Sequence, residues 1–176
     1  MALLFLIICL IILSPVGFLW LSYIELNSCK DHSYEHLVRI NKSIDALIDI
    51  APSYISVLVG ESLIDKVKNV EIKSIIDSLA KVQNCFKNSK TRYRIAKNLF
   101  KKIEAVVVES KNKPAMISSP IVMRYTDFFE RLRGDFNTNV EKYNTEIKKF
   151  KMYTKQMPTS YIAEQLKITC IMEPFD

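Results

Sequence analysis

The residue pattern with the clearest chemical meaning is H-x-x-E-H, formed by His32, Glu35 and His36. Two histidines four residues apart share one face of a helix and can bind one Zn²⁺, with the glutamate as general base. A zinc peptidase also needs a third protein ligand, and Glu104 and Glu109 are candidates. Few apolar residues near the pattern could form a pocket, so an exposed polar turn fits it as well. We therefore keep a membrane-proximal zinc peptidase as the alternative function only.

A basic segment, residues 87–102, is the second candidate site. It carries seven Lys or Arg residues and no Asp or Glu, and such a segment could bind anionic lipid or nucleic acid. Its aromatic residues and their neighbour, Phe86, Tyr93 and Phe100, lie seven residues apart, which is the spacing of a helix core rather than of base-stacking side chains. We expect a solvated basic face, and among the alternatives we favour contact with anionic lipid over specific nucleic-acid binding.

Two asparagines, Asn137 and Asn144, also lie seven residues apart, and each directly follows an aromatic residue. Their amides can bond across to a neighbouring helix and fix its register, or they can face water. The sequence alone leaves both readings open, and the family resemblance described below favours the first.

The chain shows no other chemical motif. Its four cysteines form no C-x-x-C pair, so they predict reduced packing residues and neither a disulfide framework nor a zinc site. No glycine-rich phosphate loop and no nucleophile motif occurs in the sequence. We therefore predict no catalytic, cofactor-binding or metal-binding residue.

The elements that must position these residues begin with an apolar segment. Residues 1–24 contain no charged side chain, so all 25 Lys and Arg and all 19 Asp and Glu lie in residues 25–176. A membrane-spanning helix needs roughly 20 apolar residues, and Trp20 and Tyr23 close the segment as interfacial aromatics do. A cleaved signal peptide or lipoprotein signal fits less well, because no Lys or Arg precedes the apolar run. We predict a single-pass transmembrane anchor over 1–24 and one helical domain over 25–176.

The orientation follows from the basic residues that flank the anchor. Lys30, Arg39 and Lys42 follow it, whereas no Lys or Arg precedes it. The positive-inside rule then predicts that the domain over 25–176 is cytoplasmic.

Four stretches of that domain carry apolar residues every three or four positions, the period of a helix with one buried face. They cover roughly 37–58, 72–86, 93–107 and 122–150. Pro52 predicts a kink in the first stretch, and the pattern leaves open whether residues 70–110 form one helix or two. The proline-containing stretch 110–120 predicts a loop. The fold class predicted is all-α: an N-terminal transmembrane helix followed by an antiparallel four-helix bundle of long helices.

Short motifs lie near both ends of the chain. Residues 49–55 read D-x-x-P-S-Y-I, residues 133–150 read R-x-x-F-N-x-x-V-x-x-Y-N-x-x-I-x-x-F, and residues 158–163 read P-T-S-Y-I-A. These motifs resemble those of the LemA family of bacterial membrane-anchored helical proteins.

The chain departs from that family at several places. Ser53 stands where Asn is usual, and Phe136 stands where the first Tyr is usual. Seven residues, 151–157, separate the two last motifs, where the family usually has none. Residues 61–118 match the family only weakly.

The resemblance implies one N-terminal span, a bundle of four antiparallel helices and a place in the bacterial inner membrane. It implies no catalytic residue, because the molecular function of the family is not established. The motif positions look structural; they are Asp49, Pro52, Gly60, Asn137, Tyr143, Asn144, Phe150 and Pro158. We expect a non-enzymatic protein-interaction or scaffolding module at the membrane, with protein partners or self-association and with no cofactor.

Overall fold

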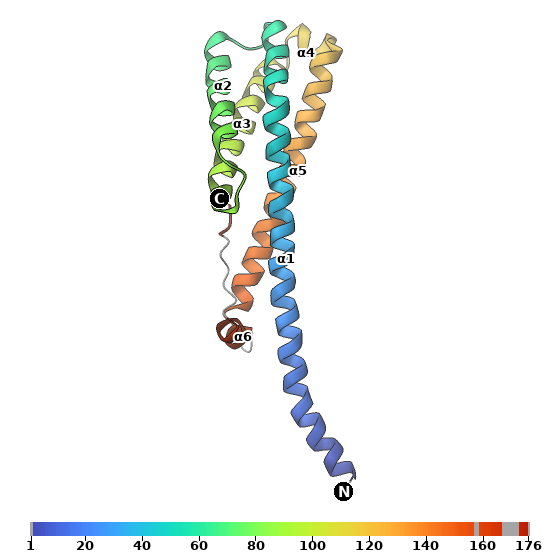
Figure 1. Ribbon diagram of the computed structural model, residues 1–176. Coiled ribbons are helices and arrows are strands. Elements are labelled where there is room, and N and C mark those ends of the chain that lie inside the picture. Colours follow the sequence, from blue (N-terminus) through green and yellow to red (C-terminus); the bar gives the residue numbers. More distant parts are fainter. Residues whose placement is uncertain (1, 157–158, 167–172, 176) are drawn as a thin grey trace. The chain divides into compact units, whose positions relative to one another are not determined.

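The computed structural model describes residues 2–156, 159–166 and 173–175 (Figure 1). These residues are helical apart from short connections and the segment 173–175. The elements in chain order are α1 (Ala2–Gly60), α2 (Lys66–Lys81), the 3₁₀ turn η1 (Phe86–Asn88), α3 (Ser89–Ser110), α4 (Pro114–Ser118), α5 (Pro120–Tyr153) and α6 (Thr159–Gln165). No strand occurs within the described ranges. The predicted all-α class is confirmed.

The chain divides into two compact units, and helices α1 and α5 each contribute residues to both. One unit consists of residues 38–140, and the other combines residues 1–37 with residues 141–176. This division reflects packing within the chain; the boundary after residue 24, which rests on polarity, stays a prediction. Each unit is described by itself below.

Aromatic side chains join the helices of the unit 38–140. Tyr54 of α1 is fully buried, and its ring stacks on Tyr125 of α5 at 5.7 Å between centroids. The Tyr54 hydroxyl also shares a hydrogen bond of 2.8 Å with the hydroxyl of Thr126. Phe100 of α3 packs against Phe136 of α5 at 5.0 Å. The apolar period of the sequence therefore does place these side chains in a common core.

Two helices, not one, occupy residues 70–110. Helix α2 ends at Lys81 and α3 begins at Ser89, with the turn η1 between them, and the two helices pack against each other. Asp65 caps α2, because its carboxylate accepts a hydrogen bond of 2.7 Å from the Lys68 amide. The predicted loop at 110–120 contains the single-turn helix α4.

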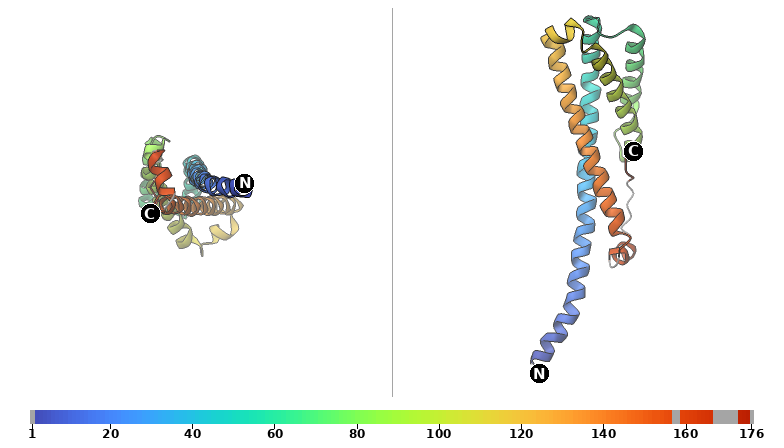
Figure 2. Two further views of the ribbon diagram at one scale, coloured as in Figure 1. Left: turned by 90° about the horizontal axis from the view of Figure 1, so that it is seen from below. Right: turned by 180° about the vertical axis from the view of Figure 1, so that it is seen from behind.

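Helix α1 is one continuous helix (Figure 2). It includes Pro52 and ends at Gly60, and a tight turn at Ser62 follows it. The amide of Leu63 donates to the Leu58 carbonyl at 2.8 Å, and the amide of Ser62 donates to the Val59 carbonyl at 3.0 Å. These two bonds define a Schellman motif, whose left-handed position is normally glycine. Here it is Ser62, with φ of 54°.

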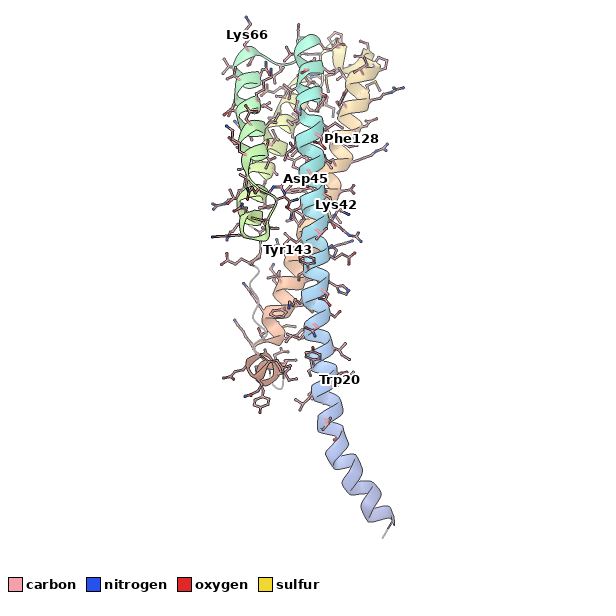
Figure 3. The ribbon with its side chains drawn as sticks, viewed as in Figure 1. Trp20, Lys42, Asp45, Lys66, Phe128 and Tyr143 are labelled. Atoms are coloured by element: carbon pink, nitrogen blue, oxygen red, sulfur yellow. The ribbon has the colours of Figure 1, made fainter. Side chains whose placement is uncertain are left out.

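Residues 16–24 of α1 present apolar side chains to their surroundings. Within the described chain, α1 is the helix with the length and apolar composition needed to cross a membrane. Its exposed large apolar residues in this part are Val16, Phe18, Trp20, Leu21 and Ile24, between 46% and 63% exposed (Trp20 is labelled in Figure 3). Because successive residues turn by about 100°, these five cover roughly 200° of the helix circumference. Protein packing thus leaves this stretch mostly uncovered.

Candidate functional site

Among the described residues, the H-x-x-E-H pattern is not joined by a third metal ligand. His32 and Glu35 are exposed on α1, and His36 is half-buried. Within residues 2–156, 159–166 and 173–175, no group of three His, Cys, Asp or Glu side chains is placed to hold a metal ion. The third ligand that the zinc-peptidase reading needs is therefore not supplied by the described part of the chain.

Some side chains of the basic segment 87–102 contact other residues of the same chain. The Lys102 ammonium pairs with Glu71 at 2.7 Å, and Lys97 lies 5.4 Å from the centre of the Tyr93 ring. Tyr93 and Phe100 are each only 4% exposed, so neither ring is available to stack on a nucleic-acid base. The side chain of Phe86 lies outside the described residues.

Arg92, in the middle of this segment, is buried. Its guanidinium is 2% exposed and donates from Nη2 to Asp45 Oδ1 at 2.5 Å and from Nη1 to Asn41 Oδ1 at 3.2 Å. Asn84 also donates to Asp45, at 3.1 Å. The Arg92 Nε atom is buried without a hydrogen-bond partner among the described residues. This ion pair links α1 to α3, and the sequence reading missed it.

Tyr143 and Asn144, two consecutive residues of α5, hold an extended segment of the chain, residues 173–175. Tyr143 is 2% exposed, and its ring stacks on Phe175 with 4.7 Å between centroids and 23° between planes (Tyr143 is labelled in Figure 3). The Tyr143 hydroxyl donates a hydrogen bond of 3.0 Å to the Glu173 carbonyl. Helix α5 thus positions one ring and one hydroxyl against the same short segment.

Asn144 binds the main chain of one residue in that segment. Its Nδ2 donates to the Phe175 carbonyl at 2.7 Å, and its Oδ1 accepts from the Phe175 amide at 2.7 Å. The amide and carbonyl of one extended residue point the same way, which is how paired residues of antiparallel strands exchange two hydrogen bonds. The Asn144 side chain takes the place of a neighbouring strand, so it recognises backbone rather than side chain.

The residue before Phe175 favours this extended form. Pro174 fixes its own φ and disfavours helical backbone at Glu173. Proline also lacks an amide proton, so position 174 needs no acceptor. Phe175 itself is buried, at 6% exposure. The site therefore combines main-chain recognition with one buried aromatic ring.

A small apolar cluster lies in the same unit, formed by Leu26 and Cys29 of α1, Phe150 of α5 and Ala163 of α6. Burial raises the pKa of the Cys29 thiol, and the neighbouring Glu146 carboxylate raises it further. The thiol is therefore uncharged at neutral pH and acts as a packing group, as the sequence predicted for it.

The other family-like positions are distributed over the surface and the core. Asp49, Pro52 and Asn137 are exposed, and Gly60 is the last residue of α1. Pro158 lies outside the described residues, whereas Phe150 is buried. The two asparagines thus differ: Asn144 bonds to an extended segment rather than to a neighbouring helix, and Asn137 faces solvent. The sequence had singled out Tyr143 and Asn144 but gave no signal for residues 173–175 as their partner.

No protein-family model, no curated protein and no solved structure matches the chain.

Proposed function

We propose that this protein is a single-pass membrane protein that acts without catalysis, as a tethered module that binds other proteins at the membrane surface. The observation that carries the proposal is the exposed apolar arc of residues 16–24. An apolar surface that the protein itself leaves uncovered marks contact with lipid or with a partner. The arc lies on the same unbroken helix as the buried stripe that follows it.

The stripe that follows shows the contrast within α1. Ile40, Ile44, Leu47 and Leu58 are each at most 1% exposed. Along this one helix, apolar side chains that the protein leaves exposed are followed by apolar side chains that the protein buries. This change is expected of an anchor that continues into the domain it tethers.

The binding role is supported by what the Tyr143–Asn144 site does. It holds an extended segment by its main chain and one ring, and this is recognition of polypeptide rather than bond-making chemistry. We take the described contacts of α1, α3 and α5, with α2 against α3, as support for the antiparallel four-helix bundle. The cytoplasmic orientation, the bacterial inner membrane and the relation to the LemA family belong to the proposal and rest on sequence.

Membrane insertion is tested with charge substitutions in the anchor. An Ile8→Lys/Ile12→Lys variant places two charges near the centre of residues 1–24. Each charge raises the free energy of membrane insertion by about 2.5–3.5 kcal/mol. We expect wild-type protein to resist alkaline carbonate extraction and the variant to be extracted. The matched control is Val67→Lys/Val70→Lys, which changes two exposed apolar residues of α2 and should leave extraction unchanged. Extraction of the wild-type protein would overturn the anchor.

Orientation and binding are tested on the same membranes. Cys85 is an exposed thiol, so a membrane-impermeant thiol reagent should label it only after cells are permeabilised, with Cys9, Cys29 and Cys170 changed to Ser. Labelling in intact cells would place the domain on the other side. Chemical crosslinking in membranes should give a reproducible product that contains this chain. The absence of any partner and of self-association would contradict the binding role.

A further inference from the structure

The segment held by Tyr143 and Asn144 has the features of a bound peptide. It is extended, it meets α5 through main-chain groups of Glu173 and Phe175, and one side chain is buried. Peptide-binding sites that add an extended chain work in this way: main-chain hydrogen bonds supply affinity and a side-chain pocket supplies selectivity. The chain's own residues 173–175 therefore show which chemistry the site accepts.

We propose that Tyr143 and Asn144 form a receptor for an extended Pro-Phe segment of a partner protein, which residues 173–175 occupy in the unpartnered chain. This proposal rests on the proposed binding function and names the partner's chemistry. The receptor groups are two consecutive residues of α5, a helix of 34 residues, so their spacing is set by the helix rather than by the bound segment.

Each position of the segment is recognised differently. The carbonyl of the residue two before Phe accepts a hydrogen bond from the Tyr143 hydroxyl. The next position has no amide to satisfy when it is proline, and proline holds the segment extended before it binds. The Phe position needs its ring for Tyr143 and both main-chain groups for Asn144. The partner motif thus contains Pro followed directly by Phe.

The test uses a fluorescent peptide with the sequence of residues 171–176, acetylated and amidated so that no terminal charge contributes. It is titrated against the full-length chain in mild detergent. The Phe175→Ala variant leaves the receptor residues in place and weakens the internal occupant. We expect this variant to bind the peptide at least roughly tenfold more tightly than wild type, because an internal competitor at about millimolar effective concentration lowers the apparent affinity.

Matched variants distinguish specific binding at Tyr143 and Asn144 from nonspecific adsorption of the peptide. Adding Asn144→Ala to Phe175→Ala should remove peptide binding, whereas adding Asn137→Ala should leave it unchanged. Both asparagines lie on α5 directly after an aromatic residue, but only Asn144 contacts the segment. A peptide with Phe replaced by Ala should not bind, and one with Pro replaced by Ala should bind several-fold more weakly.

A measurement on the wild-type chain does not depend on the Phe175→Ala variant being folded. Hydrogen exchange of the Phe175 amide should be slow, because this amide donates to Asn144, and excess peptide should accelerate it by displacing the segment. Two results together would overturn the proposal: peptide leaves the exchange rate of the Phe175 amide unchanged, and a helical Phe175→Ala variant does not bind the peptide. Residues 173–175 would then have only a structural role.

Two other outcomes would also overturn it. Equal peptide binding by the Asn144→Ala and Asn137→Ala chains would show adsorption to protein or detergent. A complex formed only when Asn144→Ala chains are mixed with Phe175→Ala chains would make the occupant a second copy of this chain rather than a partner protein. In each case the carbonate-extraction, labelling and crosslinking results stand, so failure of this proposal is distinguishable from failure of the proposed function.

Discussion

Replacing Asp45 should destabilise the protein more than replacing its partner Arg92. The two side chains share one hydrogen bond of 2.5 Å but differ in burial: the arginine side chain is 2% exposed and the aspartate side chain 48%. Asp45→Ala leaves a buried guanidinium whose remaining hydrogen-bond partner among the described residues is Asn41. Removing one partner of a buried ion pair costs about 3–5 kcal/mol, and the half-exposed aspartate puts this case at the lower end.

Arg92→Met has a different effect, because the group left behind is Asp45, which water can reach. Methionine keeps most of the aliphatic volume, and the substitution removes a buried Nε that has no partner among the described residues. Replacing a buried charge by an apolar side chain of similar volume is often neutral or stabilising. We therefore expect a change in the free energy of unfolding within about 1 kcal/mol of zero.

Thermal unfolding of the full-length chain in mild detergent, followed by circular dichroism at 222 nm, measures this difference. For a chain of this size 1 kcal/mol corresponds to roughly 2–4 °C in Tm. Asp45→Ala should lower Tm by about 6–12 °C and Arg92→Met by no more than about 4 °C. Asp49→Ala, one turn further along α1 at an exposed aspartate, is the control and should stay near wild type. Equal losses from Asp45→Ala and Arg92→Met would refute the argument from burial.

Three further predictions follow from local geometry. Gly134→Ala should raise Tm by about 2–4 °C in the same assay, because a helix gains up to about 1 kcal/mol from alanine. Apart from the adjacent residues and the local helix backbone, no heavy atom of the described residues lies within 4 Å of the added carbon. A lower Tm would mean that a neighbouring group must move. Ser62→Gly should also stabilise the protein, by about 1 kcal/mol, because glycine adopts the left-handed backbone of this position without steric cost. An unchanged Tm would show that the backbone at Ser62 is not strained. Cys29 should react with a neutral-pH thiol reagent far more slowly than Cys85, because it is buried and its pKa is raised; equal rates by mass spectrometry would show that the apolar cluster opens.

The helices were predictable where a long apolar period met a clear boundary residue. The stripe over 122–150 corresponds to α5 at Pro120–Tyr153, because each turn of that helix repeats the same buried face. The end of α1 was harder to predict. Gly60 is the last residue of α1, but the left-handed position lies two residues later, at Ser62. Turn position depends on where the capping hydrogen bonds form, and composition alone does not specify it.

The sites were predictable only in part, for two physical reasons. Tyr143 and Asn144 stood out as motif residues, but their partner lies about thirty residues away in a segment without periodicity. Arg92 was counted with the exposed basic residues, although it lies four residues before Ala96, a fully buried residue of the apolar stripe. An arginine at an apolar-stripe position is a signal that could have identified the buried ion pair.

A site that binds main chain and a single ring discriminates weakly between sequences, and this has a consequence for how partners are chosen. Asn144 makes the same two hydrogen bonds with any extended residue that has an amide and a carbonyl. Under the proposed function, selection then depends on location: a tether confines the site to one surface, where the effective concentration of neighbouring chains is high. Partners are accordingly best sought first among proteins at the same membrane surface, with a Pro-Phe pair as a second filter.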